Sequence, residues 1–97
     1  MDKLTTMKTF VSVVQEGSFS KAADKLDISP QLVSKYVSAL EEGLATRLLH
    51  RTTRKVSTTE AGDHYFTRCL QVLDDIDDME NSLDNLNENV SGVLSIS

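Results

Sequence analysis

The side chains whose types and spacing best suit chemistry lie between Pro30 and Lys55. A helix predicted to begin at Pro30 carries no acidic residue before Leu40, whereas an ordinary solvated face would carry several. On this helix Gln31 could pair with N6 and N7 of adenine, and Lys35 could reach O6 and N7 of guanine. The candidate base-reading residues are Pro30, Gln31, Leu32, Ser34, Lys35 and Ser38. A plain solvated helix face is the alternative.

Cations and hydroxyls on either side of this helix could hold a phosphate backbone. Arg51, Arg54 and Lys55 cluster in a predicted hairpin turn, where phosphate contact or entry into a minor groove competes with a solvated turn. The predicted helix start at Ser20 and Lys21 offers N–H groups and partial positive charge to an anion. The candidate backbone-contacting residues are Ser20, Lys21, Ser29, Arg51, Thr53, Arg54 and Lys55.

The sequence does not support catalysis or metal binding. A single cysteine, Cys69, excludes an internal disulfide, and two separated histidines, His50 and His64, argue against a metal site made by the protein. No nucleophile, base and orienting group occur in a recognisable pattern, and no glycine-rich phosphate loop is present. We therefore expect no enzyme activity and no metal or cofactor in this chain.

The net charge of −5 is unevenly distributed along the chain. Residues 1–58 contain nine Lys or Arg against six Asp or Glu, a net charge of +3. Residues 59–97 contain one arginine against nine acids, a net charge of −8. This asymmetry predicts a basic part that meets a polyanion and an acidic part with another role.

Three short helices are predicted in the basic part, over Leu4–Glu16, Lys21–Leu26 and Pro30 to about Glu42. Gly17 is expected to end the first helix, Ser20 to cap the second and Ser29 to cap the third. Two short strands are predicted over Arg47–Arg51 and Lys55–Thr58. Residues 1–58 therefore outline a mainly α winged helix-turn-helix, with three helices and a two-stranded wing.

A long helix is predicted from Thr59 to about Asn89. Its apolar residues are spaced alternately three and four apart over three heptads, which is typical of a helix that pairs with another. The predicted dimer interface is Cys69, Val72, Leu73, Ile76, Met79, Leu83, Leu86 and Val90. Cys69 is expected to be a small apolar filler there, with redox sensing as the alternative.

The last residues, 91–97, change to an alternating pattern, with Leu94 and Ile96 on one side and Val93, Ser95 and Ser97 on the other. This pattern predicts a strand that begins a further, missing C-terminal domain. No apolar stretch is long enough to cross a bilayer, and Met1 leads into no apolar signal region. The prediction is a soluble cytoplasmic protein.

From Phe10 to Gly62 the sequence resembles the N-terminal domain of LysR-type transcriptional regulators. The matching stretches are FVSVVQEGSFSKAA (10–23), VS (33–34), LE (40–41), LLHR (48–51) and TEAG (59–62). The resemblance implies a winged helix-turn-helix that binds DNA, a linker helix that pairs two subunits, and a C-terminal domain that binds a small-molecule effector. Tetramers of the full-length protein are compatible with it.

The sequence departs from the family pattern at a few positions. Ala45 stands where the family usually has glycine, and a glycine occurs at Gly43 instead, so the turn before the wing is expected to differ locally. Leu49 replaces a usual phenylalanine at the base of the wing, and Thr58 replaces a usual leucine. None of these changes removes a residue on which DNA binding should depend.

The expected function is that of a sequence-specific double-stranded DNA-binding domain of a bacterial regulator, which acts as a dimer on a partly palindromic promoter site. A protein-interaction module with an acidic docking rod is the first alternative. An architectural DNA binder without sequence preference is the second. A duplex affinity that falls steeply with added salt would argue against the protein-interaction module. A duplex affinity that depends on the DNA sequence would argue against the architectural binder.

Overall fold

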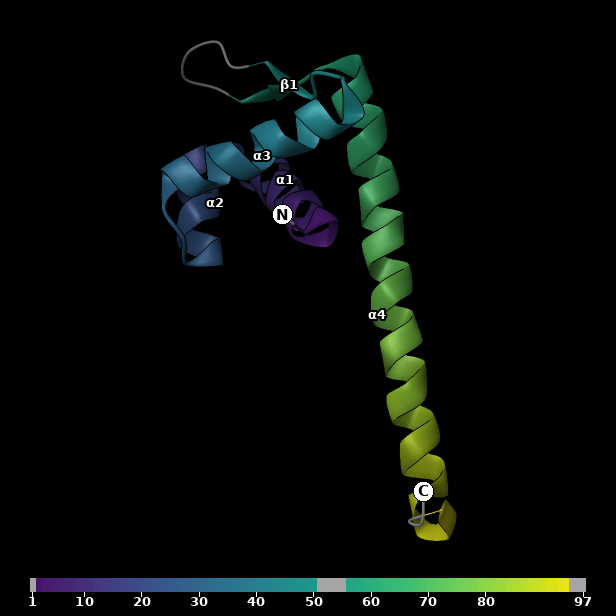
Figure 1. Cartoon of the computed structure of the whole chain (residues 1–97). Coiled ribbons are helices and arrows are strands. Elements are labelled where there is room, and N and C mark those ends of the chain that lie inside the picture. Colours follow the sequence, from purple (N-terminus) through teal and green to yellow (C-terminus); the bar gives the residue numbers. More distant parts are fainter. Residues whose placement is uncertain (1, 51–55, 95–97) are drawn as a thin grey trace.

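The computed structural model describes residues 2–50 and 56–94, and the side chains of the last helix as far as residue 83. Within these ranges the elements are α1 (Lys3–Glu16), α2 (Phe19–Leu26), α3 (Pro30–Leu44), β1 (Leu49–His50), β2 (Ser57–Thr58) and α4 (Glu60–Leu94). The first three helices and the two strands form a head, and α4 leaves it as a rod (Figure 1). The molecule measures 58 × 26 × 22 Å.

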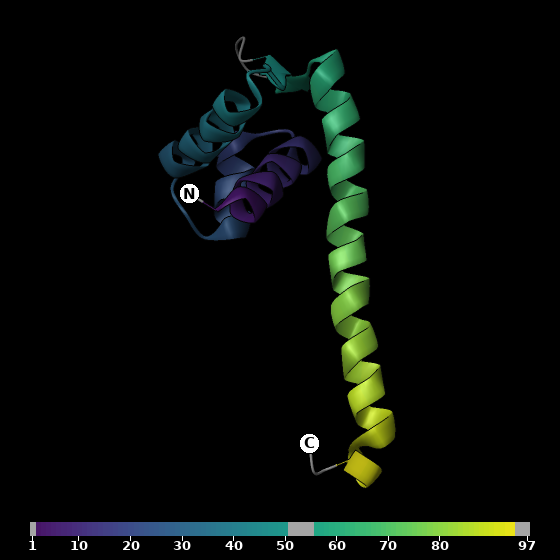
Figure 2. The ribbon, with the colours of Figure 1, turned by 45° about the vertical axis from the view of Figure 1, so that its right-hand side comes forward.

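The predicted fold class is confirmed. In the head α1, α2 and α3 pack on one another, and β1 pairs antiparallel with β2, with Leu49 opposite Thr58 and His50 opposite Ser57. Both strands are shorter than predicted. With the view turned by 45°, the rod still leaves along one side of the head, beside the strands (Figure 2).

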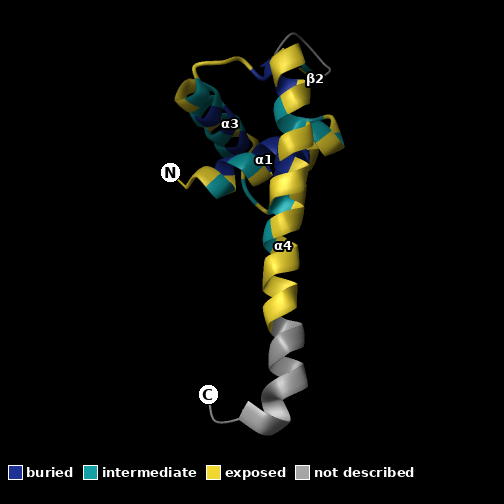
Figure 3. Cartoon of the chain, turned by 90° about the vertical axis from the view of Figure 1, so that its right-hand side faces the viewer, coloured by how far each residue is buried: buried dark blue, intermediate teal, exposed yellow. Residues whose placement is uncertain are grey.

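The apolar core lies where α1, α3 and the start of α4 meet (Figure 3). Its largest fully buried side chains are Phe10, Leu48, Leu49, Val13, Val33, Val37 and Cys69. The Phe10 ring contacts two rings of α4, with centroids 5.9 Å from Tyr65 and 6.5 Å from Phe66. The head and the first turns of α4 therefore share one core.

The start of α2 differs from the prediction. Ser18, not Ser20, is the N-cap, and its hydroxyl accepts a hydrogen bond from the Lys21 N–H at 3.3 Å. Gly17 adopts the expected left-handed conformation with φ of 70°, so Ser18 is already extended and the new helix begins at Phe19. Both serines are good capping residues, and the position of the preceding turn decides between them.

The end of α3 shows how Ala45 fills the position at which related sequences usually have glycine. Ala45 lies in the left-handed region with φ of 52°, and its N–H donates to the carbonyl of Glu42 while the Thr46 N–H donates to that of Glu41. These are the two hydrogen bonds of a Schellman motif, whose left-handed residue is usually glycine. Gly43 lies within the helix, where a Cβ would meet open space.

Exchanging the two residue types at these positions should stabilise the head. Gly43→Ala should raise the free energy of unfolding by about 1 kcal/mol because it restricts the unfolded chain and suits a helix interior. Ala45→Gly should raise it by about 1 kcal/mol because glycine tolerates positive φ. Urea titration of each variant measures the effect, and Gly17→Ala, which introduces a Cβ at positive φ, should act in the opposite direction. A loss of stability in Ala45→Gly would contradict this account of the turn.

The long helix is confirmed, but the strand predicted at its end is wrong for Ser91–Leu94, which continue α4. Thr59 caps the helix, since its Oγ1 accepts the Gly62 N–H at 2.9 Å. Extending an existing helix adds one hydrogen bond per residue, whereas a strand needs a partner, and the described residues offer none to this segment. Residues 95–97 lie outside the described part of the chain.

Candidate nucleic-acid interface

The N-terminus of α3 is built as the sequence predicts. The Ser29 hydroxyl accepts a hydrogen bond from the Leu32 N–H at 3.1 Å, and Pro30 occupies the first helical turn, where no N–H is needed. Ser29 and Pro30 are both exposed. This cap fixes where the helix begins and therefore which side chains face outward.

The two sides of α3 differ in character. Val33, Val37 and Leu40 are buried against α1 and α2. On the other side Gln31 and Lys35 are exposed and Leu32, Ser34 and Ser38 are half-buried, while Pro30 is exposed in the first turn. We call these six residues the reading face. At about 100° per residue, the Cα–Cβ directions of Gln31, Lys35 and Ser38 fall within about 60° of one another.

One exposed residue near the reading face was missed because the helix was expected to end at it. Glu42 is exposed and lies seven residues, or about two turns, beyond Lys35 on the same side of α3. A carboxylate at this position could accept a hydrogen bond from cytosine N4, and it would repel phosphate. The reading face itself carries a cation, Lys35, and the acidic residue Glu42 lies beyond its C-terminal end.

The start of α2 presents the two other described candidates. Ser20 and Lys21 are both exposed in the first turn of α2. The Lys21 N–H is hydrogen-bonded to the cap, but the Lys21 side chain reaches solvent. Contact of these two residues with phosphate stays a prediction.

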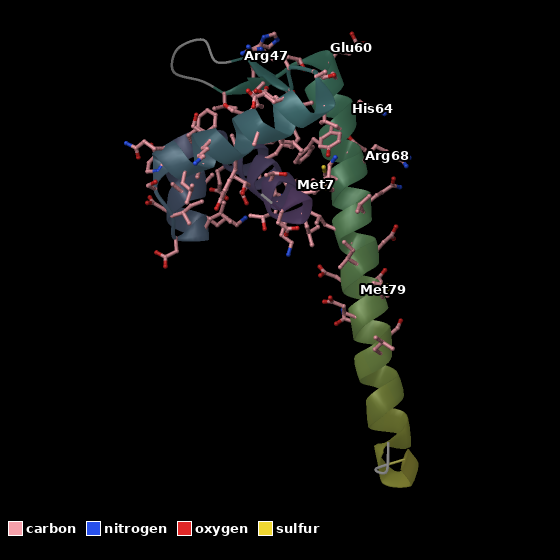
Figure 4. All side chains as sticks on the ribbon, viewed as in Figure 1. Met7, Arg47, Glu60, His64, Arg68 and Met79 are labelled. Carbon is pink, nitrogen blue, oxygen red and sulfur yellow. The ribbon has the colours of Figure 1, made fainter. Side chains whose placement is uncertain are left out.

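The wing is described at its base only. Arg51, Thr53, Arg54 and Lys55, the predicted phosphate contacts of the wing, lie outside the described residues. Arg47 and His50, at the base, are exposed, and Arg47 projects beside the strands (Figure 4). Arg47 is thus a further cation near α3 that was not among the candidates.

Glu41 connects α3 to the wing and was also missed. One of its carboxylate oxygens, Oε2, accepts hydrogen bonds from the N–H groups of Leu48 at 2.8 Å and Leu49 at 3.1 Å. Since charged acceptors form stronger hydrogen bonds than neutral ones, this side chain holds the strand to the helix firmly. Its partners are backbone groups, which no sequence pattern marks.

One residue of the predicted dimer interface, Cys69, is buried within its own chain. It is only 1% exposed in the single chain because it lies in the core shared by α1 and α4. Leu73 likewise packs against that core. Burial raises the pKa of the Cys69 thiol, although its hydrogen bond with Tyr65 opposes the shift. The cysteine is therefore a neutral apolar filler within its own subunit, which argues against redox sensing.

Beyond the head, α4 presents an apolar stripe to solvent. Val72, Met79 and Leu83 are 39%, 60% and 56% exposed, and Ile76 is half-buried. Met79 lies well away from the head along the rod (Figure 4). The side chains of Leu86 and Val90 lie outside those described. The rest of the rod surface carries acids, including Asp74, Asp75, Asp77, Asp78 and Glu80.

The described residues contain no cluster of three or more His, Cys, Asp or Glu side chains that could hold a metal ion. None of the helices, over the part of the chain that the structure covers, combines the length and apolar composition needed to cross a membrane.

Comparison with known proteins agrees with this geometry. Residues 4–63 match the family model described as bacterial regulatory helix-turn-helix protein, lysR family. An uncharacterized HTH-type transcriptional regulator of Haemophilus influenzae is 46% identical over all 97 residues, which cover 34% of that protein. The chain spans about a third or less of the length of the curated relatives that it matches first.

Solved structures match as well. The DNA-binding domain of BenM in complex with the catB site 1 DNA superposes with a TM-score of 0.84 and 37% identity, covering 89% of this chain and 96% of that one. Full-length LysG of Corynebacterium glutamicum with bound effector Arg gives a TM-score of 0.78 and 30% identity, covering 88% of this chain and 29% of that one.

Proposed function

Because this chain belongs to the lysR family of bacterial regulatory helix-turn-helix proteins, we propose that it is the sequence-specific, double-stranded DNA-binding part of a transcriptional regulator. The observation that carries the proposal is the reading face of α3. It exposes Gln31 and Lys35 on a helix whose opposite side is buried, so the helix can enter a major groove without losing its packing. The DNA complex of the similar BenM domain supports the same role here.

We further propose that two subunits pair along α4. The apolar stripe of Val72, Met79 and Leu83 is exposed in the single chain, and the acids around it would keep the rod away from DNA. Pairing would hold two heads at a fixed separation. The DNA site that such a dimer binds is then a partly palindromic promoter element, with half-sites about one helical turn or slightly more apart.

The remainder of the protein is expected to bind a small-molecule effector. Two facts support this proposal: the chain spans about a third of its curated relatives, and the similar full-length LysG holds an effector. A regulator of bacterial promoters would work in the cytoplasm, where the chromosome lies. Residues 59–90 would be the linker, residues 91–97 would lead toward the effector domain, and a tetramer could form through that domain. The role is regulatory, and no reaction is assigned to this chain.

Selection of bound duplexes from a random pool, at moderate salt, tests the proposed function. Enrichment of an interrupted inverted repeat is the expected result, because a symmetric dimer reads two related half-sites. Bound but unenriched DNA would favour an architectural binder. Failure of a folded, dimeric sample to retain any duplex would overturn the proposal and favour the protein-docking alternative.

Lys35→Ala should lower affinity for the selected site by about 1–3 kcal/mol, because a direct base contact is lost. Its affinity for unrelated duplexes should change less, so the ratio between the two falls. Fluorescence anisotropy with both duplexes at one salt concentration measures this ratio.

Lys25→Ala is the matched control, since Lys25 lies in the last turn of α2, where its Nζ is 3.6 Å from the Glu16 Oε2, and it is not part of the reading face. Arg54→Ala should weaken binding to all sequences alike.

If Lys35→Ala leaves both the affinity and the site preference unchanged, α3 is not the reading helix. If Lys25→Ala weakens specific binding as much as Lys35→Ala does, the effect is one of net charge and not of base contact.

A further inference from the structure

Leu48 is a point at which three elements of the head meet. Its N–H donates to Glu41 of α3, as described above, and its carbonyl accepts a hydrogen bond from the Thr59 N–H at 3.0 Å. Leu48 itself precedes β1 and is fully buried. A displacement of the start of α4 therefore acts on the same residue that Glu41 holds to α3.

Thr59 and Gly62 make the contact between α4 and Leu48 close. The Thr59 Oγ1 donates to the Arg47 carbonyl at 2.7 Å and accepts the Gly62 N–H at 2.9 Å. A Cβ at Gly62 would lie 1.9 Å from the Leu48 carbonyl oxygen, so only glycine fits there without a backbone shift. We call Glu41, Leu48, Thr59 and Gly62 the Leu48 junction.

A second contact lies further along α4. There the ring of Phe10 packs against Tyr65 and Phe66, and Cys69 is buried beside them. Gly62 and Cys69 are seven residues apart, so the two contacts are separated by about 10 Å along the helix axis and face the same side. A rod held at two such points cannot pivot freely on the head.

We propose that the Leu48 junction sets the angle between α4 and α3, and thereby the spacing between half-sites that the dimer accepts. The inference rests on the proposed function, because it concerns how two heads on paired rods meet one DNA molecule. The residues of the junction are positioning residues, since none of them belongs to the reading face.

The geometry of DNA makes spacing a sensitive readout of this angle. One added base pair moves a half-site by about 3.4 Å along the axis and turns it by about 35°. A dimer with fixed heads accepts one spacing and discriminates against the next. A dimer with loosened heads follows the DNA to either spacing, while each head still binds an isolated half-site as before.

Thr59→Val tests the junction in the 97-residue chain, because valine keeps the shape of threonine but cannot make the hydroxyl hydrogen bonds to Arg47 and Gly62. Affinities are measured for a single half-site, for the selected inverted repeat, and for repeats with one base pair added or removed. We expect half-site affinity to stay unchanged. Discrimination between spacings should fall by at least about fivefold, since each of the two lost hydrogen bonds contributes roughly that factor.

Thr59→Ser and Thr58→Val are the matched controls. Serine restores the hydroxyl and should restore the spacing preference. The Thr58 hydroxyl donates to the Asp63 carboxylate at 3.2 Å and takes part in none of the hydrogen bonds of the Leu48 junction described above, so it should not affect spacing. Glu41→Gln provides a second test from the α3 side, because it keeps an acceptor but removes the charge that strengthens both hydrogen bonds.

The outcomes separate this inference from the proposed function. A relaxed spacing preference with intact half-site affinity, in Thr59→Val or Glu41→Gln, supports it. An unchanged preference in both variants overturns it, and so does an equal loss of half-site and full-site affinity, which would indicate a merely structural role. If the unmodified chain selects no repeat at all, the proposed function fails first and this inference falls with it.

Discussion

Phe10→Ala is expected to lower the free energy of unfolding by about 3–5 kcal/mol, the cost of deleting a buried aromatic side chain and leaving a cavity. The Phe10 side chain is 0% exposed and touches two rings of α4. Because small domains have total stabilities near the lower end of about 5–15 kcal/mol, much of the folded population at 37 °C should be lost. The same change removes the aromatic contact that ties the rod to the head.

Urea unfolding followed by circular dichroism measures this loss. Phe19→Ala is the matched control, since it deletes the same side chain from a position that is only partly buried at the edge of the core. Its cost should be clearly smaller. If the two variants are equally stable, the packing of Phe10 contributes less to stability than its burial indicates.

The helices of the head were predictable because local signals agree with long-range packing. Ser29 and Pro30 mark a start, and the apolar spacing of Val33, Val37 and Leu40 matches the buried side of α3. Since that spacing fixes which residues point inward, it also fixes the reading face. The cap, the apolar side and the outward polar side chains of α3 are all formed by residues close together in the sequence. A single sequence is therefore enough to locate them.

The errors occur where the sequence pattern is compatible with two local structures. Ser18 and Ser20 are both suitable caps, and only the exact end of the Gly17 turn selects Ser18. Cys69 satisfies a heptad and also faces the head, and packing against Phe10 and its neighbours determines that it is buried within the subunit. Ser91–Leu94 alternate like a strand, but the helix before them simply continues.

The Leu48 junction could not be predicted, because its hydrogen bonds join side chains to backbone groups of distant residues. Glu41 reaches N–H groups seven and eight residues away, and Thr59 reaches a carbonyl twelve residues away. Periodicity contains no information about such contacts. Gly62 was the one sign of the junction in the sequence. A glycine in the first turn of a long helix lowers helix stability, and a close approach of another backbone segment is one reason for its presence.

Leu83→Asp is expected to convert the proposed dimer to monomers. Leu83 lies in the apolar stripe of α4 and is 56% exposed in the single chain, so a carboxylate there is well solvated in the monomer. In a paired rod the same carboxylate would be buried with a second copy nearby, and desolvation and repulsion would both oppose pairing. Sedimentation equilibrium measures the change. Affinity for an inverted repeat should fall by about 10²–10⁴-fold, since the two heads no longer act as one ligand.

Leu70→Asp is the matched control for this change. Leu70 is also an exposed leucine of α4, 38% exposed, but it lies about 140° around the helix from Leu83 and outside the heptad pattern. The Leu70 variant should therefore stay dimeric. For Leu83→Asp, half-site affinity should equal that of the unmodified chain, because the head does not contain this residue. Monomers that still bind the full repeat tightly would separate dimerisation from DNA affinity. A persistent dimer in Leu83→Asp would place the subunit interface away from the stripe, and the two heads would then be related by a different axis of symmetry.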